Sequence, residues 1–155
     1  MKRSAGLLPF RRRDGALEVF LVHPGGPFWR NKDEGAWSIP KGEADEGEDL
    51  FEAARREFEE ETAFRPSGEF IPLSPIKQKS GKTVHAWAVE GDLDPAAIRS
   101  NTFTMEWPPK SGKHAEFPEV DRAAFFDLET ARHKINPAQS LLLAQLEAAI
   151  ATRRA

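Results

Sequence analysis

The sequence predicts one α/β domain built around a mixed sheet. The chain has 155 residues, which is enough for one buried core and too few for two comfortable domains. Short apolar runs of strand length alternate along it with segments of helical periodicity. Hydrophobic residues make up 39% and charged residues 30%, and neither a repeat nor a low-complexity tract interrupts this globular composition. We therefore expect a single domain over residues 1–155.

The N-terminal residues predict a β-hairpin followed by a loop. Residues 5–10 and 17–22 have strand character and flank a charged turn at residues 11–15. Residues 23–36 are rich in glycine and proline and carry Phe28 and Trp29. A brief extended piece at residues 37–39 ends at Pro40, and residues 41–47 read as a polar loop.

A helix is predicted over residues 49–62. Asp49 and Glu52 have capping-box spacing, with the acid three residues after the N-cap. Phe51, Ala54 and Phe58 fall on one stripe of this helix, which predicts the side that faces the core.

The remaining elements follow the same reasoning. Residues 71–76 and 83–89 predict strands, and the irregular stretch 92–109 contains a further strand candidate at residues 102–106. Residues 123–127 predict another strand. A short helix over residues 128–135 and a long one over 137–153 close the chain, the latter with proline in its first turn.

Composition excludes several classes of function. A net charge of −3 provides no general attraction to nucleic acid or to anionic lipid. No apolar run approaches the roughly 20 residues of a membrane span, and the N-terminal apolar stretch is too short for a signal peptide. The absence of cysteine excludes disulfides, thiolate zinc sites and cysteine nucleophiles, and the four histidines lack zinc-site spacing. We expect a cytoplasmic protein.

The predicted helix ends in an unusual cluster of acids. Glu57, Glu59, Glu60 and Glu61 put four carboxylates in five positions. There they repel one another and oppose the helix macrodipole by roughly 0.3–1 kcal/mol each. Three of them, Glu57, Glu60 and Glu61, span about 100° of helix surface beside the apolar stripe. Oxygen ligands at this density indicate Mg²⁺ or Mn²⁺.

A charged, solvated helix face is the alternative interpretation of these acids. In that case Arg55 and Arg56 pair with Glu52 and Glu59, and no metal is needed. The loop before the helix favours the metal site, because Gly42 lets backbone approach a ligand and Lys41 offers a charge to a phosphate.

From residue 42 to residue 64 the chain resembles the Nudix hydrolase family, which includes MutT-like enzymes. The family's box is G-x5-E-x7-R-E-U-x-E-E-x-G-U, where U is bulky and apolar. The residues in register are Gly42, Glu48, Arg56, Glu57, Phe58, Glu60, Glu61 and Phe64. One fixed position departs, because Ala63 stands where the family has the glycine that ends the helix. Alanine there should cost about 1 kcal/mol or shift the C-cap, without touching a catalytic group.

The resemblance implies a fold and a chemistry. The fold would be an α/β/α sandwich with a mixed sheet. The reaction would be attack of water on phosphorus in a nucleoside diphosphate linked to another moiety. Glu57, Glu60, Glu61 and the Gly42 carbonyl would hold the Mg²⁺ (or Mn²⁺) cofactor, and the box glutamates would act in catalysis. Arg56 and Glu48 would form a structural ion pair.

The resemblance leaves the general base open. It would be a box glutamate or an acid from a later loop, for which Glu116 and Glu119 are the candidates. Glu119 is slightly preferred. For either residue, a solvated loop charge is the alternative.

Residues 37–42 resemble the W-x-x-P-K-G lead-in of Nudix enzymes that act on dinucleoside polyphosphates and diphosphoinositol polyphosphates. Lys41 would contact phosphate, and Trp37 would be either a ligand residue or part of the core. Lys79 and Lys82 are candidates to steer a polyphosphate, although solvated loop charges also explain them. His85 would line the cleft or face solvent.

These features predict a Mg²⁺-dependent pyrophosphohydrolase. Its substrate would be a dinucleoside polyphosphate such as diadenosine tetraphosphate, or a nucleoside triphosphate. The partner would be this small molecule, without a stable nucleic-acid partner or a membrane, and the protein would be a monomer or homodimer. Two alternatives stay open: a catalytically idle nucleotide-binding or regulatory Nudix module, and an enzyme that removes 5′ pyrophosphate from RNA. Arg11, Arg12 and Arg13 favour the second alternative, and the net charge opposes it.

Overall fold

The protein is a mixed β-sheet with helices on both faces. The computed structural model describes residues 2–78 and 80–154. Its main sheet has seven strands in the order β4-β6-β1-β2-β9, with β3 paired to β1 and β5 paired to β6. Their bounds are β1 Arg3–Arg13, β2 Ala16–Pro24, β3 Lys41–Glu43, β4 Phe70–Pro72, β5 Ile76–Lys77, β6 Thr83–Glu90 and β9 Val120–Asp127. The β1–β6 pair is parallel and the other pairs are antiparallel.

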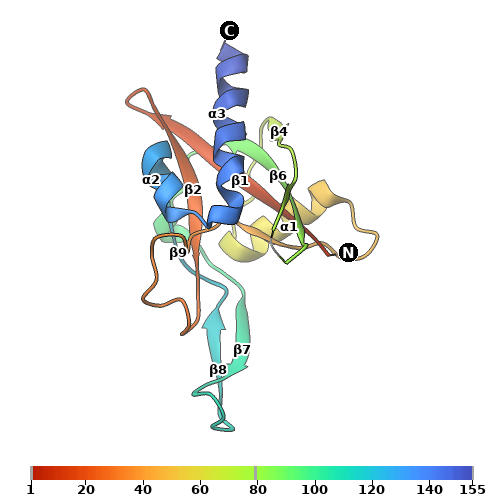
Figure 1. Cartoon of the computed structure of the whole chain (residues 1–155), viewed down its shortest axis with the longest axis vertical. Coiled ribbons are helices and arrows are strands. Elements are labelled where there is room, and N and C mark those ends of the chain that lie inside the picture. Colours follow the sequence, from red (N-terminus) through yellow and green to blue (C-terminus); the bar gives the residue numbers. More distant parts are fainter. Residues whose placement is uncertain (1, 79, 155) are drawn as a thin grey trace.

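Three helices cover this sheet (Figure 1). They are α1 (Leu50–Thr62), α2 (Leu128–Lys134) and α3 (Ser140–Arg154), with short 3-10 turns at Pro95–Ala97 and Pro137–Gln139. Within residues 2–78 and 80–154, no helix is long and apolar enough to cross a membrane.

Alternation along the central strands creates two cores. Leu7 and Phe20 pack with α1, whereas Leu8 and Leu21, their neighbours in sequence, pack with α2 and α3. Successive strand residues point to opposite faces, so both faces of a sheet with apolar residues at every position must be covered. The α/β/α sandwich with a mixed sheet is thereby confirmed.

Both ends of α1 are capped as the sequence predicts. The Asp49 side chain accepts a hydrogen bond from the Glu52 amide at 3.0 Å. At the other end Ala63 adopts the left-handed conformation, with φ 70°, and its amide donates to the Glu59 carbonyl at 2.7 Å. The helix therefore ends where the glycine of the box would end it, with an alanine in a strained conformation.

The hairpin turn is tighter than predicted. Arg11, Arg12 and Arg13 belong to β1, and Arg13 pairs directly with Ala16. The turn is Asp14-Gly15 alone, with φ 52° and 79°. Two left-handed residues match the twist of a two-residue hairpin, which is why Asp-Gly serves here.

Other strand boundaries also differ from the prediction. Residues 41–43 are not loop but the short strand β3, which pairs with β1. The expected strand over residues 71–76 is two pieces, β4 and β5, both paired to β6. The strand at residues 102–106 is present as β7 (Thr102–Glu106) and pairs with β8 (His114–Pro118), which the sequence did not predict.

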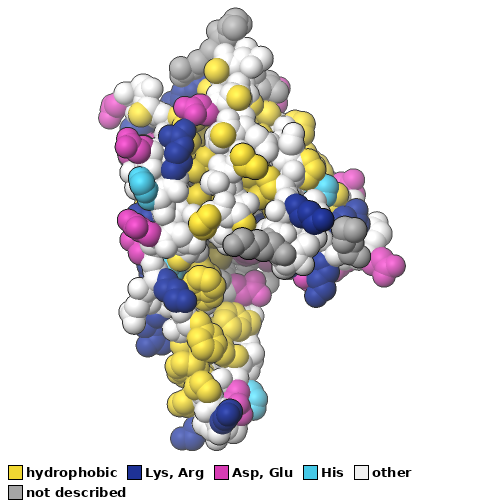
Figure 2. Space-filling view, in the orientation of Figure 1, with side chains coloured by type: hydrophobic (Ala, Val, Ile, Leu, Met, Phe, Trp, Pro, Cys, Tyr) yellow, Lys and Arg dark blue, Asp and Glu magenta, His cyan; other side chains and the backbone are white. Residues whose placement is uncertain are grey.

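The β7–β8 hairpin extends away from the main sheet, at the bottom of Figure 1. Phe103 and Phe117 lie side by side on one of its faces, with ring centroids 6.0 Å apart. Trp107 at its end meets Phe28 edge-on at 5.5 Å. Figure 2 shows the hydrophobic side chains gathered over this part of the molecule. The hairpin thus carries an aromatic face toward the loop after β2.

The left-handed C-cap yields a stability prediction. Ala63→Gly should raise the free energy of unfolding by about 1 kcal/mol, because glycine adopts this conformation without the Cβ penalty. For a chain of this size that corresponds to a rise in Tm of about 2–4 °C. Ala144→Gly, at an exposed position within α3, should lower Tm by a similar amount. Thermal unfolding of both variants checks this, and a fall in Tm for Ala63→Gly would contradict it.

Candidate active site

The site begins where β3 meets α1. Gly42 pairs with Ala5 of β1, and its Cα faces the carboxylate of Glu57 on the helix. A Cβ at position 42 would overlap that carboxylate. Only glycine therefore lets the β3 backbone come this close to the acids of α1.

Arg56 ties the loop to the helix. Its Nε and Nη2 donate to the two carboxylate oxygens of Glu48 at 2.9 and 3.0 Å, and its Nη1 donates to Glu60 at 2.8 Å and to Glu57 at 3.2 Å. The bidentate pair, with a further bond from the Asp45 amide, lowers the pKa of Glu48 to about 2. One guanidinium thus connects the loop acid with two acids of the helix.

The other charges of the helix face elsewhere. Glu59 pairs with Arg65 at 2.7 Å, and Arg55 pairs with Glu52 at 3.4 Å. The charged face that was the alternative to a metal site is therefore present in part: Arg55 pairs with Glu52 as expected, but Glu59 pairs with Arg65 and not with Arg56. No ion pair with Glu61 is present among the described residues.

Glu61 is the unbalanced acid of the site. Its side chain is buried, with 8% of the residue exposed. Burial, together with the nearby charges of Glu57 and Glu119, raises the pKa of Glu61 to about 8, against the opposing influence of Lys41. Burial and the Glu60 charge also raise the pKa of Glu57 and of Glu119. The site therefore holds more negative charge than its own cations compensate.

This set of acids fits a hard divalent cation. The donors are carboxylate and carbonyl oxygens, the Gly42 backbone has room to approach, and a cation would offset the desolvation of Glu61. Among the described residues, no three histidine, aspartate or glutamate side chains converge on one point. Arg56 explains this, because its guanidinium draws Glu60 and Glu57 to itself.

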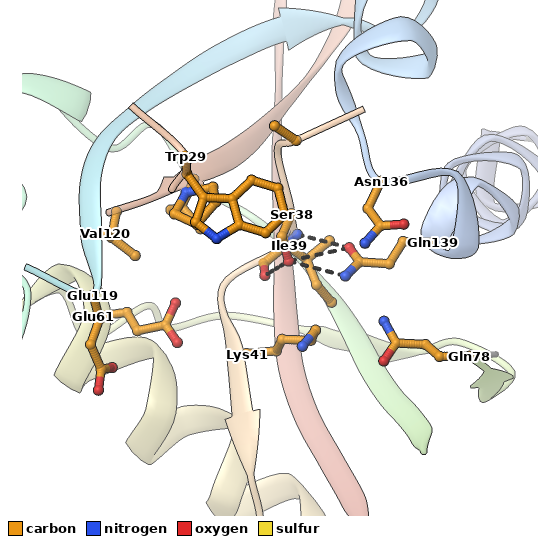
Figure 3. Close-up of a pocket in the computed structure, with 13 residues that line it drawn as sticks. Trp29, Ser38, Ile39, Lys41, Glu61, Gln78, Glu119, Val120, Asn136 and Gln139 are labelled. Carbon is orange, nitrogen blue, oxygen red and sulfur yellow. Dashed lines mark hydrogen bonds between the residues drawn. The ribbon is translucent and has the colours of Figure 1, made fainter. Parts of the chain in front are cut away.

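A cavity of about 240 Å³ opens beside these acids (Figure 3). Glu61 and Glu119 lie at one end of it, and Trp29 lies over the middle. Lys41 projects into it from β3, and burial followed by the charge of Lys82 lowers the pKa of the Lys41 amine. An amine flanked by the acids and open to the cavity can bind an anionic group such as phosphate.

The far end of the cavity is lined by neutral polar side chains that the sequence did not single out. Gln139, itself buried, accepts a hydrogen bond from the Ile39 amide and donates one to Ser38, each at 3.0 Å. Asn136 and Gln78 complete this end. The Asn136-Pro137 step, an N-cap followed by proline, was the available local signal, but it indicates a helix start rather than a site.

The remaining predicted site residues are placed as follows. Trp37 lies in the core, 4% exposed, where its Nε1 donates to Asp33 at 2.8 Å. Lys82 pairs with Glu43 at 3.1 Å. His85 is partly buried on β6 outside the cavity lining, and burial lowers its pKa. Glu116 is exposed on β8, away from the cavity, whereas Glu119 lines it. Lys79 lies outside the described residues.

Comparison with known proteins identifies the family of this chain. The family model described as NUDIX domain matches residues 1–146. A curated protein described as an octanoyltransferase, from Myxococcus xanthus, is 31% identical over 139 residues. That match covers 90% of this chain and 34% of the relative, so the chain spans about a third of the relative's length.

Solved structures share the fold. An Ap4A hydrolase from C. elegans, in a binary complex, superposes with a TM-score of 0.68 at 23% identity, over 98% of this chain and 99% of that one. The NUDIX domain of Shewanella oneidensis NrtR with ADP ribose gives 0.63 at 18% identity, over 96% and 87%. A mutT/nudix family protein from Listeria innocua gives 0.62 at 18% identity, over 98% and 95%. At these identities the likeness is one of fold.

The buried carboxyl of Glu61 predicts a pH-dependent stability. Its folded-state pKa of about 8 lies above the ordinary value of 4.5, so the folded protein keeps a proton that the unfolded chain has lost between those pH values. Without metal, the stability that this proton confers is complete below pH 4.5 and is lost as the pH rises toward 8.

Glu61→Gln is neutral at every pH and should remove this loss. With chelator present, its Tm should exceed that of the unchanged protein at pH 8, and the difference should shrink toward pH 5. Glu59→Gln, on the other face of α1, should show no such pH-dependent gain. A Tm difference for Glu61→Gln that is constant with pH would contradict the assignment.

Proposed function

We propose that this chain, which belongs to the NUDIX domain family, is a pyrophosphohydrolase that depends on Mg²⁺ and hydrolyses a dinucleoside polyphosphate. The single observation that carries this proposal is the cavity that a buried, uncompensated acid, Glu61, and the Lys41 amine both line. A magnesium polyphosphate supplies both charges that this cavity needs, a cation for Glu61 and an anion for Lys41.

The acids of α1 would hold the metal. Glu57, Glu60, Glu61 and the Gly42 carbonyl form its oxygen donor set, and Glu60 would turn from Arg56 toward the ion. When bound, Mg²⁺ (or Mn²⁺) neutralises phosphate oxygens and makes water a better nucleophile. Arg56 keeps its bidentate bond to Glu48 and so holds the loop against the helix while Glu60 moves.

Glu119 would serve as the general base. It lines the cavity at the same end as Glu61 and stands on a different segment from the metal-binding acids. Burial and the charge of Glu60 raise its pKa toward neutrality, which favours proton uptake from water over the uptake by an ordinary surface carboxylate. Lys41 would bind the phosphate that the water attacks.

Positive charge beside the acids supports a phosphorylated substrate. Lys41 lines the cavity, and burial followed by the charge of Lys82, which itself pairs with Glu43, lowers the pKa of the Lys41 amine. Trp29, which lines the cavity, is 40% exposed and offers stacking surface to a base. The C. elegans structure, named as an Ap4A hydrolase, points to the same substrate class. A cytoplasmic location remains a prediction of composition.

Metal-dependent turnover gives the first test of this proposal. Glu57→Gln should lower kcat/KM by at least about a hundredfold, because it removes a metal ligand. Calorimetry should also show weaker Mg²⁺ binding. The matched control is Glu59→Gln, on the same helix but turned away, which should keep both properties. Full activity in Glu57→Gln would refute the metal assignment. Nucleotide binding without any turnover by the unchanged protein would favour the idle module.

Substrate preference gives the second test. In a Mg²⁺-dependent phosphate-release screen, diadenosine tetra- or pentaphosphate should have the highest kcat/KM. The panel should include ATP, ADP-ribose, diphosphoinositol polyphosphates and 5′-triphosphorylated RNA. A clear preference for ADP-ribose or for a nucleoside triphosphate would refute the ranking. Preference for the RNA, with salt-sensitive binding, would favour the RNA-processing alternative.

A further inference from the structure

His23 is a buried side chain that the proposed chemistry does not use. It is fully buried at the end of β2, 0% exposed, and its ring meets Trp37 edge-on at 5.2 Å. Both ring nitrogens are engaged: Nδ1 with an oxygen of Asp121 at 2.9 Å, and Nε2 with the Lys32 carbonyl at 2.6 Å. A carbonyl oxygen can only accept, so Nε2 donates to Lys32, and Nδ1 is the nitrogen that faces the Asp121 carboxylate.

The bond to Asp121 coincides with an irregularity of the sheet. His23 pairs with Arg122, but the next residue, Pro24, pairs with Val120, so Asp121 is the extra residue of a β-bulge. A bulge bends its strand and redirects the neighbouring side chains. Glu119 stands two positions before this extra residue.

The backbone of Glu119 is fixed from both sides. Its amide donates to the Asn101 carbonyl at 2.8 Å, and its carbonyl accepts from the Gly25 amide at 2.9 Å. Gly25 lies so close to Pro118 that a Cβ there would overlap the Pro118 carbonyl. The direction of the Glu119 side chain therefore depends on how β2 and β9 join, which is where His23 lies.

The bond to Lys32 reaches the opposite wall of the cavity. The Lys32 amide donates to the Trp29 carbonyl at 3.0 Å, so the peptide groups of this turn connect Trp29 to His23. The Lys32 amine also lies 5.1 Å from the centre of the Trp29 ring. Trp29 and Glu119 both line the cavity, and they come from segments about 90 residues apart in the chain.

We propose that His23 is a positioning residue that holds two walls of the cavity in register, Glu119 through Asp121 and Trp29 through the Lys32 carbonyl. The inference rests on the proposed function in one respect, because it takes Glu119 as the base. The two contacts can be removed one at a time, because Nδ1 binds Asp121 on the Glu119 side and Nε2 binds Lys32 on the Trp29 side.

Two substitutions of His23 each remove one of these contacts. His23→Gln places an amide nitrogen near the position of Nε2, so it retains the bond to Lys32 and loses the one to Asp121. His23→Asn places its amide nitrogen near Nδ1, so it retains Asp121 and loses Lys32. Both variants leave one buried polar group unpaired, so a general loss of stability should affect them alike.

The expected kinetic effects differ. His23→Gln should lower kcat by about ten- to a hundredfold through misplacement of Glu119, with KM little changed. His23→Asn should raise KM through misplacement of Trp29, with kcat little changed. In a Glu119→Gln background, His23→Gln should cause no further loss of kcat, which is the coupling that a positioning role requires. Equal effects of the two variants on kcat and KM, or full additivity with Glu119→Gln, would overturn the proposal.

Hydrogen exchange supplies a readout that does not depend on turnover. His23→Gln should speed exchange of the Gly25 and Glu119 amides, and His23→Asn that of the Lys32 amide. The Ala53 amide within α1 should exchange as before in both. Unchanged exchange at residues 25, 32 and 119 would overturn the inference. If Glu119→Gln keeps full activity, the base assignment fails, and exchange alone then decides the role of His23.

Asp121→Ala tests the same contact without relying on the His23 variants to fold. Its side chain is 27% exposed, so its removal disturbs the core less, and it breaks the same bond from the other end. It should reproduce the fall in kcat of His23→Gln. Normal kcat in a folded Asp121→Ala protein would refute the claim that His23 positions Glu119 through Asp121.

Discussion

The site depends on how closely the β3 backbone approaches α1. Because residue 42 lacks a Cβ, the strand can lie directly against the Glu57 carboxylate, and its pairing with β1 holds it there. This approach encloses Glu61 between the helix and Lys41, which raises the pKa of a carboxyl that water would otherwise keep ionised. The burial of Glu61 is thus a consequence of backbone packing, and the number of acids alone does not produce it.

Arg56 gives the same acids a second arrangement. A guanidinium offers five N–H donors in a rigid fork, and here they serve the loop acid Glu48 and the helix acids Glu57 and Glu60 together. The bidentate bond to Glu48 is the tighter one, since it occupies both oxygens of that carboxylate. Glu60 is held by a single nitrogen and is half-exposed, so it is the acid that can exchange Arg56 for a metal at least cost.

Local patterns predicted the parts of the protein that local interactions determine. The spacing of Asp49 and Glu52 predicted the cap of α1, and short apolar runs predicted β1, β2 and β6. The structure departs from prediction where partners distant in sequence decide. Residues 41–43 form a strand only because β1 lies beside them, and β8 only because β7 does. The polar lining from Gln139 depends on its bonds to residues 38 and 39, which no local pattern contains.

Residues 42–64 carry most of the acids of the site, and residues outside that segment shape the cavity around them. The 23 residues from Gly42 to Phe64 supply the acids of α1, and their spacing could be read directly from the sequence, whereas Lys41 and Glu119 lie outside them. The walls around that charge come from the loop after β2, from the segment joining β8 to β9 and from the start of the C-terminal helical region. Those walls meet through buried polar contacts such as His23 with Asp121 and Gln139 with Ile39. A chain can therefore keep its metal site and change its substrate by altering residues that the box does not contain, because buried polar bonds fix geometry more strictly than apolar packing does.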